Sequence, residues 1–432
     1  MIPPNSNSMT TRAIARCLAL FLISSICITS AQAQKKGQKS AAPAQSEQQK
    51  RVALDISRIV WPNPPAIARL KFQVILTGQK IDWAGLQSKK KPKQSWMDRL
   101  AGAQPDAQVK DVESKVGFQL MRPYGVAADS KGNIYAADQG VGAIFIFPRG
   151  EAEGLELIKH GKDARLPMIN GLAIDDGDRL LVTDAKLHHV LVFNQKHEPE
   201  AVFGAESLVS PAGVAVDTTN RFVYVVDTQQ DQVLVFDADS YKLLRRIGTG
   251  GKKHTLASPG DFSLPTNVAV DKSGNVYVTD TLNNRVEMFD PDGQFISEFG
   301  KAGDGPGRFA RPKGIAIDGD GHIWVADELE SRVQVFDQQG QLLLYLGERG
   351  EYPGQFEGLY GIAFDKANNR IITSEQFPGR VQVFRYVTDA EAAAEKVRRE
   401  AGKNGAANSQ GSEPQKGGGP AKEQMSAATS RQ

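Results

Sequence analysis

The chain has only two cysteines among its 432 residues, Cys17 and Cys27, and both lie within residues 1–33. Residues 34–432 therefore contain no thiol that could form a disulfide or bind a metal. The formal net charge is only +2, so the overall composition gives no reason to expect a nucleic-acid-binding protein. No run of about 20 apolar residues is present, and the sequence therefore predicts no membrane-spanning helix.

The first 33 residues have the pattern of an export signal. Arg12 and Arg16 precede an apolar run over residues 17–29, and Ala31-Gln32-Ala33 offers a small-x-small cleavage site. The apolar run is too short to cross a bilayer. We therefore expect a soluble exported protein, periplasmic or extracellular, after cleavage near Ala33.

Six units of similar sequence follow one another along the chain. Each begins with a strand-like run that ends in an aspartate: Asp129, Asp175, Asp217, Asp271, Asp318 and Asp365. A second apolar run then ends in an acidic residue: Asp138, Asp184, Asp227, Asp280, Asp327 and Glu375. A third run reaches a phenylalanine: Phe147, Phe193, Phe236, Phe289, Phe336 and Phe384. Repeats of this length indicate a solenoid or a propeller.

Each unit resembles one propeller blade in size and composition. Runs rich in Val, Ile, Phe and Tyr alternate with Gly, Asn, Asp and Ser, which predicts short strands joined by turns. A fourth run often ends in Gly, as at Gly248, Gly300 and Gly347. The first run of all six units has alanine at its centre, and a small residue suits the crowded axis of a ring. The sequence predicts an all-β, six-bladed propeller over residues 116–387.

The two ends of the ring explain how it closes. The sixth unit is followed by a predicted short helix over residues 388–402, with Thr388 and Glu391 as a capping box, in place of a fourth strand. The missing strand is available near the N-terminus, where residues 68–78 end in Gly like other fourth strands. We therefore expect residues 59–78 to pair with the sixth unit, which removes an exposed sheet edge.

Three segments lie outside the predicted ring. Residues 34–58 form a basic leader and residues 403–432 a polar tail, and both have the composition of disordered chain. Residues 79–115 form an insertion with a candidate short helix over 95–102. Residues 34–115 carry 16 basic and 7 acidic side chains, whereas residues 116–387 carry 27 basic and 37 acidic ones. An acidic ring disfavours nucleic acid as a partner.

The repeat motif resembles a known family. The pattern P-x-G-[VI]-A-[VI]-D, G-N-[VI]-Y-V-[TA]-D, N-x-R-V-x-[VM]-F is clearest in residues 264–289 and 311–336 and is similar to the NHL repeat. The Trp61-Pro62 segment resembles the leader of exported bacterial six-bladed NHL proteins. The resemblance implies a six-bladed propeller. Its members include protein-binding, RNA-binding and sensor modules, and related propellers include lyases and lactonases.

The histidines do not form the pattern that a catalytic zinc would need. An amidating-lyase resemblance would imply three imidazoles at equivalent inner-strand positions, yet none of the six histidines lies on a predicted first strand. A lactonase-like site would use oxygen ligands for calcium, with Asn170 and Asn267 as candidates. The second acidic series recurs in every unit, which indicates that it braces the hairpins instead of forming one site.

The remaining candidate is a binding face at one end of the ring. Loops before the first strands and loops between the second and third strands open on the same end of a propeller. The residues expected around this channel mouth are Tyr124, Asn170, Thr266, Asn267, Lys313, Tyr360, His189, Arg285, Arg332, Phe377 and Arg380. Aromatic and arginine side chains on rigid loops are typical of binding surfaces.

The sequence therefore predicts a binding module that is not an enzyme. We expect it to recognise a protein or peptide, to act as a monomer, to have no nucleic-acid partner and not to be integral to a membrane. No cofactor is expected. The alternative is a metal-dependent lyase or lactonase-like hydrolase at the central channel, with calcium or zinc as its metal.

Overall fold

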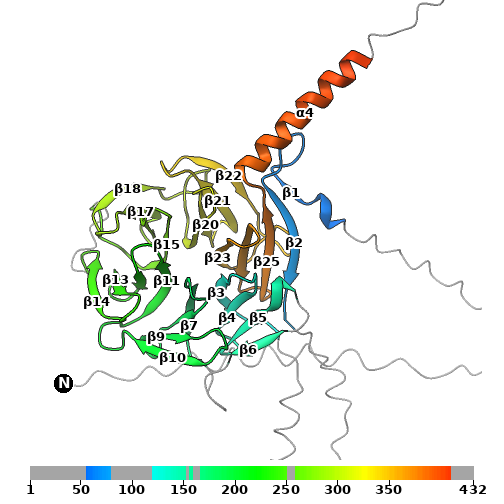
Figure 1. The fold of residues 1–432 in the computed structure, drawn as a ribbon. Coiled ribbons are helices and arrows are strands. Elements are labelled where there is room, and N and C mark those ends of the chain that lie inside the picture. The colour runs from blue at the N-terminus through cyan, green and yellow to red at the C-terminus, as the bar shows by residue number, and fades with distance from the viewer. Residues whose placement is uncertain (1–54, 79–118, 152–154, 159–165, 251–257, 410–432) are drawn as a thin grey trace, which may run out of the picture. The chain divides into compact units, whose positions relative to one another are not determined.

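The computed structural model describes residues 55–78, 119–151, 155–158, 166–250 and 258–409 (Figure 1). In these ranges the strands form six sheets, of which five have four strands and one has five. The innermost strands of successive sheets contact one another, and the last of them contacts the first. The predicted six-bladed β-propeller is thereby confirmed, and its axis runs between the innermost strands.

The four strands of each blade occupy equivalent positions in the repeat. The innermost strands are β3 (Pro123–Ala128), β7 (Ile169–Ile174), β11 (Pro211–Asp217), β15 (Pro265–Val270), β19 (Pro312–Ile317) and β23 (Leu359–Asp365). The second strands are β4 (Ile134–Asp138), β8 (Leu180–Asp184), β12 (Phe222–Asp227), β16 (Val276–Asp280), β20 (Ile323–Asp327) and β24 (Arg370–Glu375).

The third and fourth strands complete the antiparallel blades. The third strands are β5 (Ala143–Phe147), β9 (His189–Phe193), β13 (Gln232–Asp237), β17 (Arg285–Phe289), β21 (Arg332–Phe336) and β25 (Arg380–Tyr386). The outer strands are β6 (Glu156–Ile158), β10 (Pro199–Phe203), β14 (Leu243–Ile247), β18 (Phe295–Phe299), β22 (Leu342–Leu346) and, in the sixth blade, β2 (Leu70–Leu76) with β1 (Val60–Trp61). Two short 3-10 helices are η1 (Ile56–Arg58) and η2 (Pro148–Gly150).

The innermost strands pack backbone to backbone because they carry glycine at their third position. A Cβ on Gly171 would lie 2.3 Å from the carbonyl oxygen of Ala212 in the next blade, and one on Gly361 would lie 2.2 Å from that of Tyr124. Real Cβ atoms do not approach so closely. In the fourth blade Asn267 replaces this glycine, and its Oδ1 accepts a hydrogen bond of 2.9 Å from the Val268 amide.

The N-terminal strand β2 closes the ring, as the sequence predicts. It pairs antiparallel with β25, with Leu70 opposite Tyr386, Phe72 opposite Phe384 and Leu76 opposite Val381. The side chains of these three residues of β2 are buried. A single sheet is thus built from both ends of the described chain.

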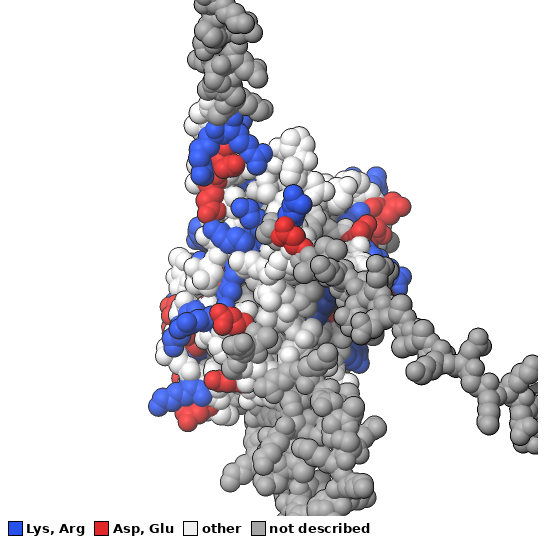
Figure 2. Space-filling view, turned by 90° about the vertical axis from the view of Figure 1, so that its right-hand side faces the viewer, with Lys and Arg blue, Asp and Glu red and all other residues white. Residues whose placement is uncertain are grey.

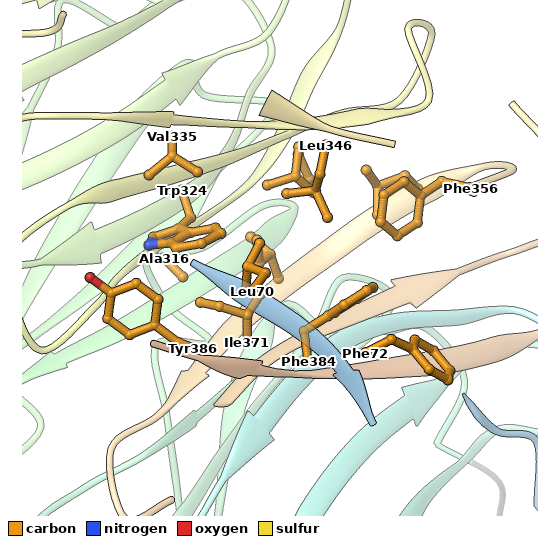
Figure 3. Close-up of a cluster of buried hydrophobic side chains, with 14 residues drawn as sticks. Leu70, Phe72, Ala316, Trp324, Val335, Leu346, Phe356, Ile371, Phe384 and Tyr386 are labelled. Carbon is orange, nitrogen blue, oxygen red and sulfur yellow. The ribbon is translucent and has the colours of Figure 1, made fainter. Parts of the chain in front are cut away.

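The cluster shown in Figure 3 joins the closing strand to the fifth and sixth blades. Leu70 and Phe72 lie beside Phe384 from β25, and Trp324 and Leu346 approach from the fifth blade. The Phe72 and Phe384 rings meet edge to face, with centroids 5.8 Å apart. Burial of such side chains contributes about 1.5–3 kcal/mol each, so β2 is a main source of stability for the closed ring.

The C-terminal helix is longer than the sequence predicts. Helix α4 spans Asp389–Ser409, whereas the sequence predicts a helix that ends at residue 402. The helix therefore continues through Gly402 and Gly405, although glycine has a low helix propensity. Its capping box is present, because the Thr388 amide donates to Glu391 Oε2 at 2.9 Å. Figure 2 shows charged side chains of both signs where α4 joins the blades.

No helix in the described part of the chain is long and apolar enough to cross a membrane. The predicted signal over residues 1–33, most of the leader over 34–58, the insertion over 79–115 and most of the tail over 403–432 lie outside the described residues. Export and the helix over residues 95–102 therefore stay predictions.

A buried glutamate replaces glutamine in one of the repeats. In Gln334 and Gln382 the side-chain Oε1 accepts a hydrogen bond from a loop amide, and the side-chain Nε2 donates one to a loop carbonyl. Glu287 occupies the equivalent position in the fourth blade. Its Oε2 accepts a hydrogen bond of 2.7 Å from the Gly260 amide, and its Oε1 lies 2.6 Å from Arg285 Nη2. Burial raises the pKa of Glu287 to about 7.

Glu287→Gln is expected to stabilise the protein at alkaline pH. Because the folded-state pKa of Glu287 lies above the value for the unfolded chain, the free energy of unfolding should fall as pH rises from about 4.5 to about 7. The variant should remove this loss and gain on the order of 2–3 kcal/mol at pH 8. Urea unfolding from pH 4 to pH 8 measures the effect. Glu298→Gln, at the more exposed partner of Arg285, is the control, and identical pH profiles for Glu287→Gln and the unaltered chain would contradict the prediction.

Candidate functional site

Six residues, one from each blade, occupy the second position of the innermost strands. They stand directly before the third position, where the strands of neighbouring blades pack backbone to backbone. We call them the mouth residues: Tyr124, Asn170, Ala212, Thr266, Lys313 and Tyr360. The positions that end the strands carry the same or similar residues in all six units, whereas the mouth positions carry five different types. A site at the axis of a ring needs such differences, because each blade must contribute another group.

Three mouth residues from the first, fifth and sixth blades lie against one another. The rings of Tyr124 and Tyr360 have centroids 4.3 Å apart, and Lys313 Nζ lies 5.4 Å from the centroid of Tyr360. All three side chains are half-buried. The structure therefore brings an amine and two phenols together at the mouth.

Burial changes the acid–base properties of two of these groups. It lowers the pKa of the Lys313 ammonium below its usual 10.5, although the charge of Glu328 acts in the opposite direction. Burial also raises the pKa of the Tyr360 hydroxyl above its usual 10.0. Lys313 is thus easier to deprotonate than an exposed lysine, while Tyr360 stays protonated. Groups with perturbed pKa values are found more often at functional sites than elsewhere.

Amide groups occupy another sector of the mouth. Asn170 Oδ1 accepts a hydrogen bond of 2.5 Å from Gln139 Nε2, and its Nδ2 donates to the Pro211 carbonyl at 2.9 Å. Gln139 lies between β4 and β5, so the two kinds of loop do open on the same end of the ring. Thr266 is buried and lies 2.7 Å from the Thr281 hydroxyl, and Asn267 lines the cavity below.

Three predicted arginines brace loops. Arg285 and Arg380 are only 5% and 3% exposed. Arg285 Nε lies 3.0 Å from Asp280 Oδ2, and Arg380 Nη2 lies 2.8 Å from Glu375 Oε2. These two residues do not line a surface. Arg332 also braces a loop, because its Nη2 donates to the carbonyl of Asp304 at 2.7 Å.

The second acidic series has the bracing role that the sequence indicates. Asp138 accepts bonds from the amides of Met121, Arg122 and Val141, and Asp327 accepts from those of Ala310 and Arg311. These bonds satisfy loop amides that would otherwise be buried without partners. The series therefore fixes the loops that surround the mouth.

A central cavity of about 410 Å³ begins just below the mouth. Its wall includes the six alanines at the centres of the innermost strands: Ala127, Ala173, Ala215, Ala269, Ala316 and Ala363. Their small side chains leave the axis hollow. Asp175, Asp178 and Lys366 line the cavity near its other end.

A ring of exposed apolar side chains surrounds the mouth on the loops of this end. It consists of Met121, Met168, Leu187, Val209, Leu264, Leu282, Leu329 and Phe377. Phe377 is 58% exposed, which agrees with its predicted place on the face, whereas His189 is half-buried at the start of β9. Exposed apolar groups around a polar centre are typical of a binding site.

The mouth does not offer the ligands that a lactonase-like calcium ion or an amidating-lyase zinc ion would use. None of the six mouth residues is a carboxylate or a histidine, and Lys313 is the one basic residue among the six. The carboxylate of Glu328 is 3.6 Å from Arg311 Nη1. The side-chain oxygens of Asn170 and Asn267, the calcium candidates, already accept hydrogen bonds from Gln139 Nε2 and from the Val268 amide. The six mouth residues bring no carboxylate that could complete a set of oxygen ligands, so these residues do not fit a metal.

Sequence reasoning placed Lys313 and both tyrosines at the mouth but missed their contact and the lowered pKa of Lys313. It also missed Gln139 and Glu328. The signal available in the sequence was the variety of residues at one repeat position.

Two family models together match most of the propeller sequence. Residues 95–304 match the SMP-30/Gluconolactonase/LRE-like region, and residues 309–336 match the NHL repeat. The resemblance to NHL repeats is thereby confirmed.

Three curated proteins are similar to parts of the chain. Protein brain tumor of Drosophila melanogaster is 29% identical over 133 residues, which are 30% of this chain and 13% of that protein. A probable peptidyl-alpha-hydroxyglycine alpha-amidating lyase of Caenorhabditis elegans is 31% identical over 101 residues, 23% of this chain and 28% of that protein. The peptidyl-glycine alpha-amidating monooxygenase of Mus musculus is 28% identical over 217 residues, 49% and 19% of the two chains. The matches thus span less than a third of each relative.

Solved structures are similar to part of the chain at low sequence identity. A gluconolactonase from Xanthomonas campestris has a TM-score of 0.47 and 17% identity, covering 62% of this chain and 86% of that one. A virginiamycin B lyase from Staphylococcus aureus has a TM-score of 0.46 and 14% identity, covering 62% and 96%.

The prediction that the chain is not an enzyme is wrong. The region matched over residues 95–304 is named for a gluconolactonase, and amidating enzymes are among the curated relatives. The prediction relied on the absence of a recognisable set of metal ligands in the sequence. The chain is a six-bladed β-propeller in which one segment matches the NHL repeat and another matches the SMP-30/gluconolactonase/LRE-like region.

Proposed function

We propose that this chain is an enzyme of the lyase or lactonase type, with its active site at the channel mouth and Lys313 as the general base. The observation that supports this most is the contact of half-buried Lys313 with Tyr360, in which burial lowers the pKa of the amine. A base works best when its pKa lies near the working pH. Lys313 is shifted in that direction.

The groups at the mouth can divide the work of such a reaction. Neutral Lys313 would accept a proton from the substrate or from a water molecule. Tyr360, whose pKa is raised, would donate a hydrogen bond to an oxygen that becomes negative. The amides of Asn170 and Gln139 would orient a polar substrate group, and the rigid strands would hold all of them in place. The metal of the earlier lyase or lactonase alternative has no part in this proposal.

The first candidate reaction is that of a lyase whose substrate is a peptide. The identity to amidating lyases supports it, and the apolar ring around the mouth suits the side chains of a peptide. Lactone hydrolysis is the second candidate, because the family region that matches residues 95–304 is named for a gluconolactonase.

Turnover of defined substrates tests the proposal. The full chain would be incubated with a peptidyl-alpha-hydroxyglycine and, separately, with a set of sugar lactones, each with and without EDTA. We expect turnover of one class, unaffected by EDTA. Turnover that EDTA abolishes would contradict the role of Lys313 as a metal-independent base, and folded protein that converts neither class would contradict the enzymatic proposal.

A further inference from the structure

A second group of possible ligands lies at the end of the ring opposite the mouth. It consists of Asp320 and His322, in the turn between β19 and β20, and Asp389, the first residue of α4. One ligand atom from each residue lies within 4.8 Å of the others. We propose that Asp320, His322 and Asp389 bind a divalent transition-metal ion, zinc foremost, which fastens the start of α4 to the fifth blade.

The imidazole of His322 is oriented as in a metal ligand. Its Nδ1 lies 3.0 Å from Asp318 Oδ2, and its Nε2 lies 3.7 Å from Asp389 Oδ2. A carboxylate on one ring nitrogen fixes the proton there and directs the lone pair of the other nitrogen outward, an arrangement typical of metal-bound histidine. His322 Nε2 is therefore the nitrogen available to an ion.

The supporting carboxylate is itself held in place. The Asp318 side chain is buried, and Trp324 Nε1 donates to its Oδ2 at 2.9 Å. The Tyr386 hydroxyl lies 3.1 Å from His322 Nδ1, and in Figure 3 it points to the same end of the buried cluster as the Trp324 nitrogen. The imidazole is thus fixed by both the fifth blade and the closing strand pair.

Each of the two proposed carboxylate ligands uses one oxygen for the protein. Asp320 Oδ2 accepts from the Tyr386 hydroxyl at 2.7 Å and from the Asp389 amide at 2.9 Å. Asp389 Oδ1 accepts from Arg69 Nη2. Within the described residues Asp320 Oδ1 accepts no hydrogen bond, and Asp389 Oδ2 faces His322. One oxygen of each carboxylate is therefore available to an ion.

The charge of the cluster favours a divalent cation. Asp318, Asp320 and Asp389 contribute three negative charges, and Arg69 contributes one positive charge, so the group carries two excess negative charges when His322 is neutral. A divalent ion would neutralise them. Calcium and magnesium prefer oxygen ligands throughout, whereas one imidazole with two carboxylates suits zinc and its neighbours in the periodic table.

Metal titration of the tag-free full chain, treated first with EDTA, tests the proposal. We expect one equivalent of Zn²⁺ by calorimetry, a higher melting temperature with Zn²⁺, and visible absorption from Co²⁺ bound by a nitrogen and oxygens. His322→Gln and Asp389→Asn should each weaken Zn²⁺ at least tenfold and remove the melting shift. Circular dichroism of the metal-free variants would confirm that they fold.

A second histidine provides the matched control. His197 occupies a turn of the second blade, is partly buried, and lies 3.2 Å from the Tyr135 hydroxyl through Nε2. His197→Gln should bind Zn²⁺ like the unaltered chain. The proposal would be overturned if no equivalent of metal bound, if binding survived in His322→Gln, or if it were lost in His197→Gln.

Discussion

A chain that begins at residue 80 should lose most of the stability of one that begins at residue 34. The shorter chain lacks β2, whose Leu70 and Leu76 are fully buried and whose Phe72 is 7% exposed. Removing three such side chains costs about 1.5–3 kcal/mol each, and the strand pairing with β25 is lost as well. This total is comparable with the whole stability of many domains, so we expect the shorter chain to melt far lower or not to fold.

A milder pair of substitutions separates the packing of β2 from the presence of the segment. Leu70→Ala combined with Phe72→Ala should cost about 5 kcal/mol or more, because each leaves a cavity. Gln73→Ala, at an exposed position of the same strand, should have little effect. Thermal and urea unfolding measure both. Equal melting temperatures for the chains that begin at 34 and at 80 would show that β2 does not hold the ring closed.

Replacement of Lys313 should reduce kcat by about 10²–10⁴-fold, the usual contribution of a general base. Lys313→Arg keeps the positive charge but cannot be deprotonated near neutral pH, so it should be as inactive as Lys313→Met. Activity of the unaltered chain should rise with pH through the lowered pKa of Lys313, since only the neutral amine accepts a proton. Steady-state kinetics on the substrate identified by turnover, from pH 6 to pH 10, measure both effects.

The control for Lys313 is a lysine at the other end of the cavity. Lys366 is exposed and lines the far end, so Lys366→Met should keep kcat and the pH profile. The Lys313→Met chain should also be at least as stable as the unaltered one at neutral pH, because it removes a charge that burial disfavours. A Lys313→Arg chain with normal kcat would rule Lys313 out as the base.

The fold was predictable because its information is repeated six times. The acidic residues and phenylalanines that end the strands recur at nearly fixed spacing, so each blade supports the assignment of the others. The closing strand was predictable because the sixth unit lacks a fourth strand and residues 68–78 supply a strand-like run before the first unit. The end of α4 was not predictable, because the glycines at 402 and 405 argue for an earlier stop.

The position of the candidate site was predictable from the sequence, but the contacts among its side chains were not. The mouth residues follow from the topology, yet the contact of Lys313 with Tyr360 depends on how two neighbouring blades pack. Arg285 and Arg380 were assigned to the surface because a repeat pattern does not show depth. Their ion pairs bury them. The group of Asp320, His322 and Asp389 forms only because α4 begins beside a turn of the fifth blade.

The position of β2 also sets the order of events during synthesis. Arg69, just before β2, bonds to Val387, 318 residues later. Ribosomes add about 5–20 residues each second, so β2 must wait on the order of 15–60 s for its partner strand. Throughout that time Leu70, Phe72 and Leu76 have no core to enter. The apolar side chains of β2 therefore stay exposed on the nascent chain for longer than those of the later strands. This makes the closing segment the natural target for a chaperone before the last blade is complete.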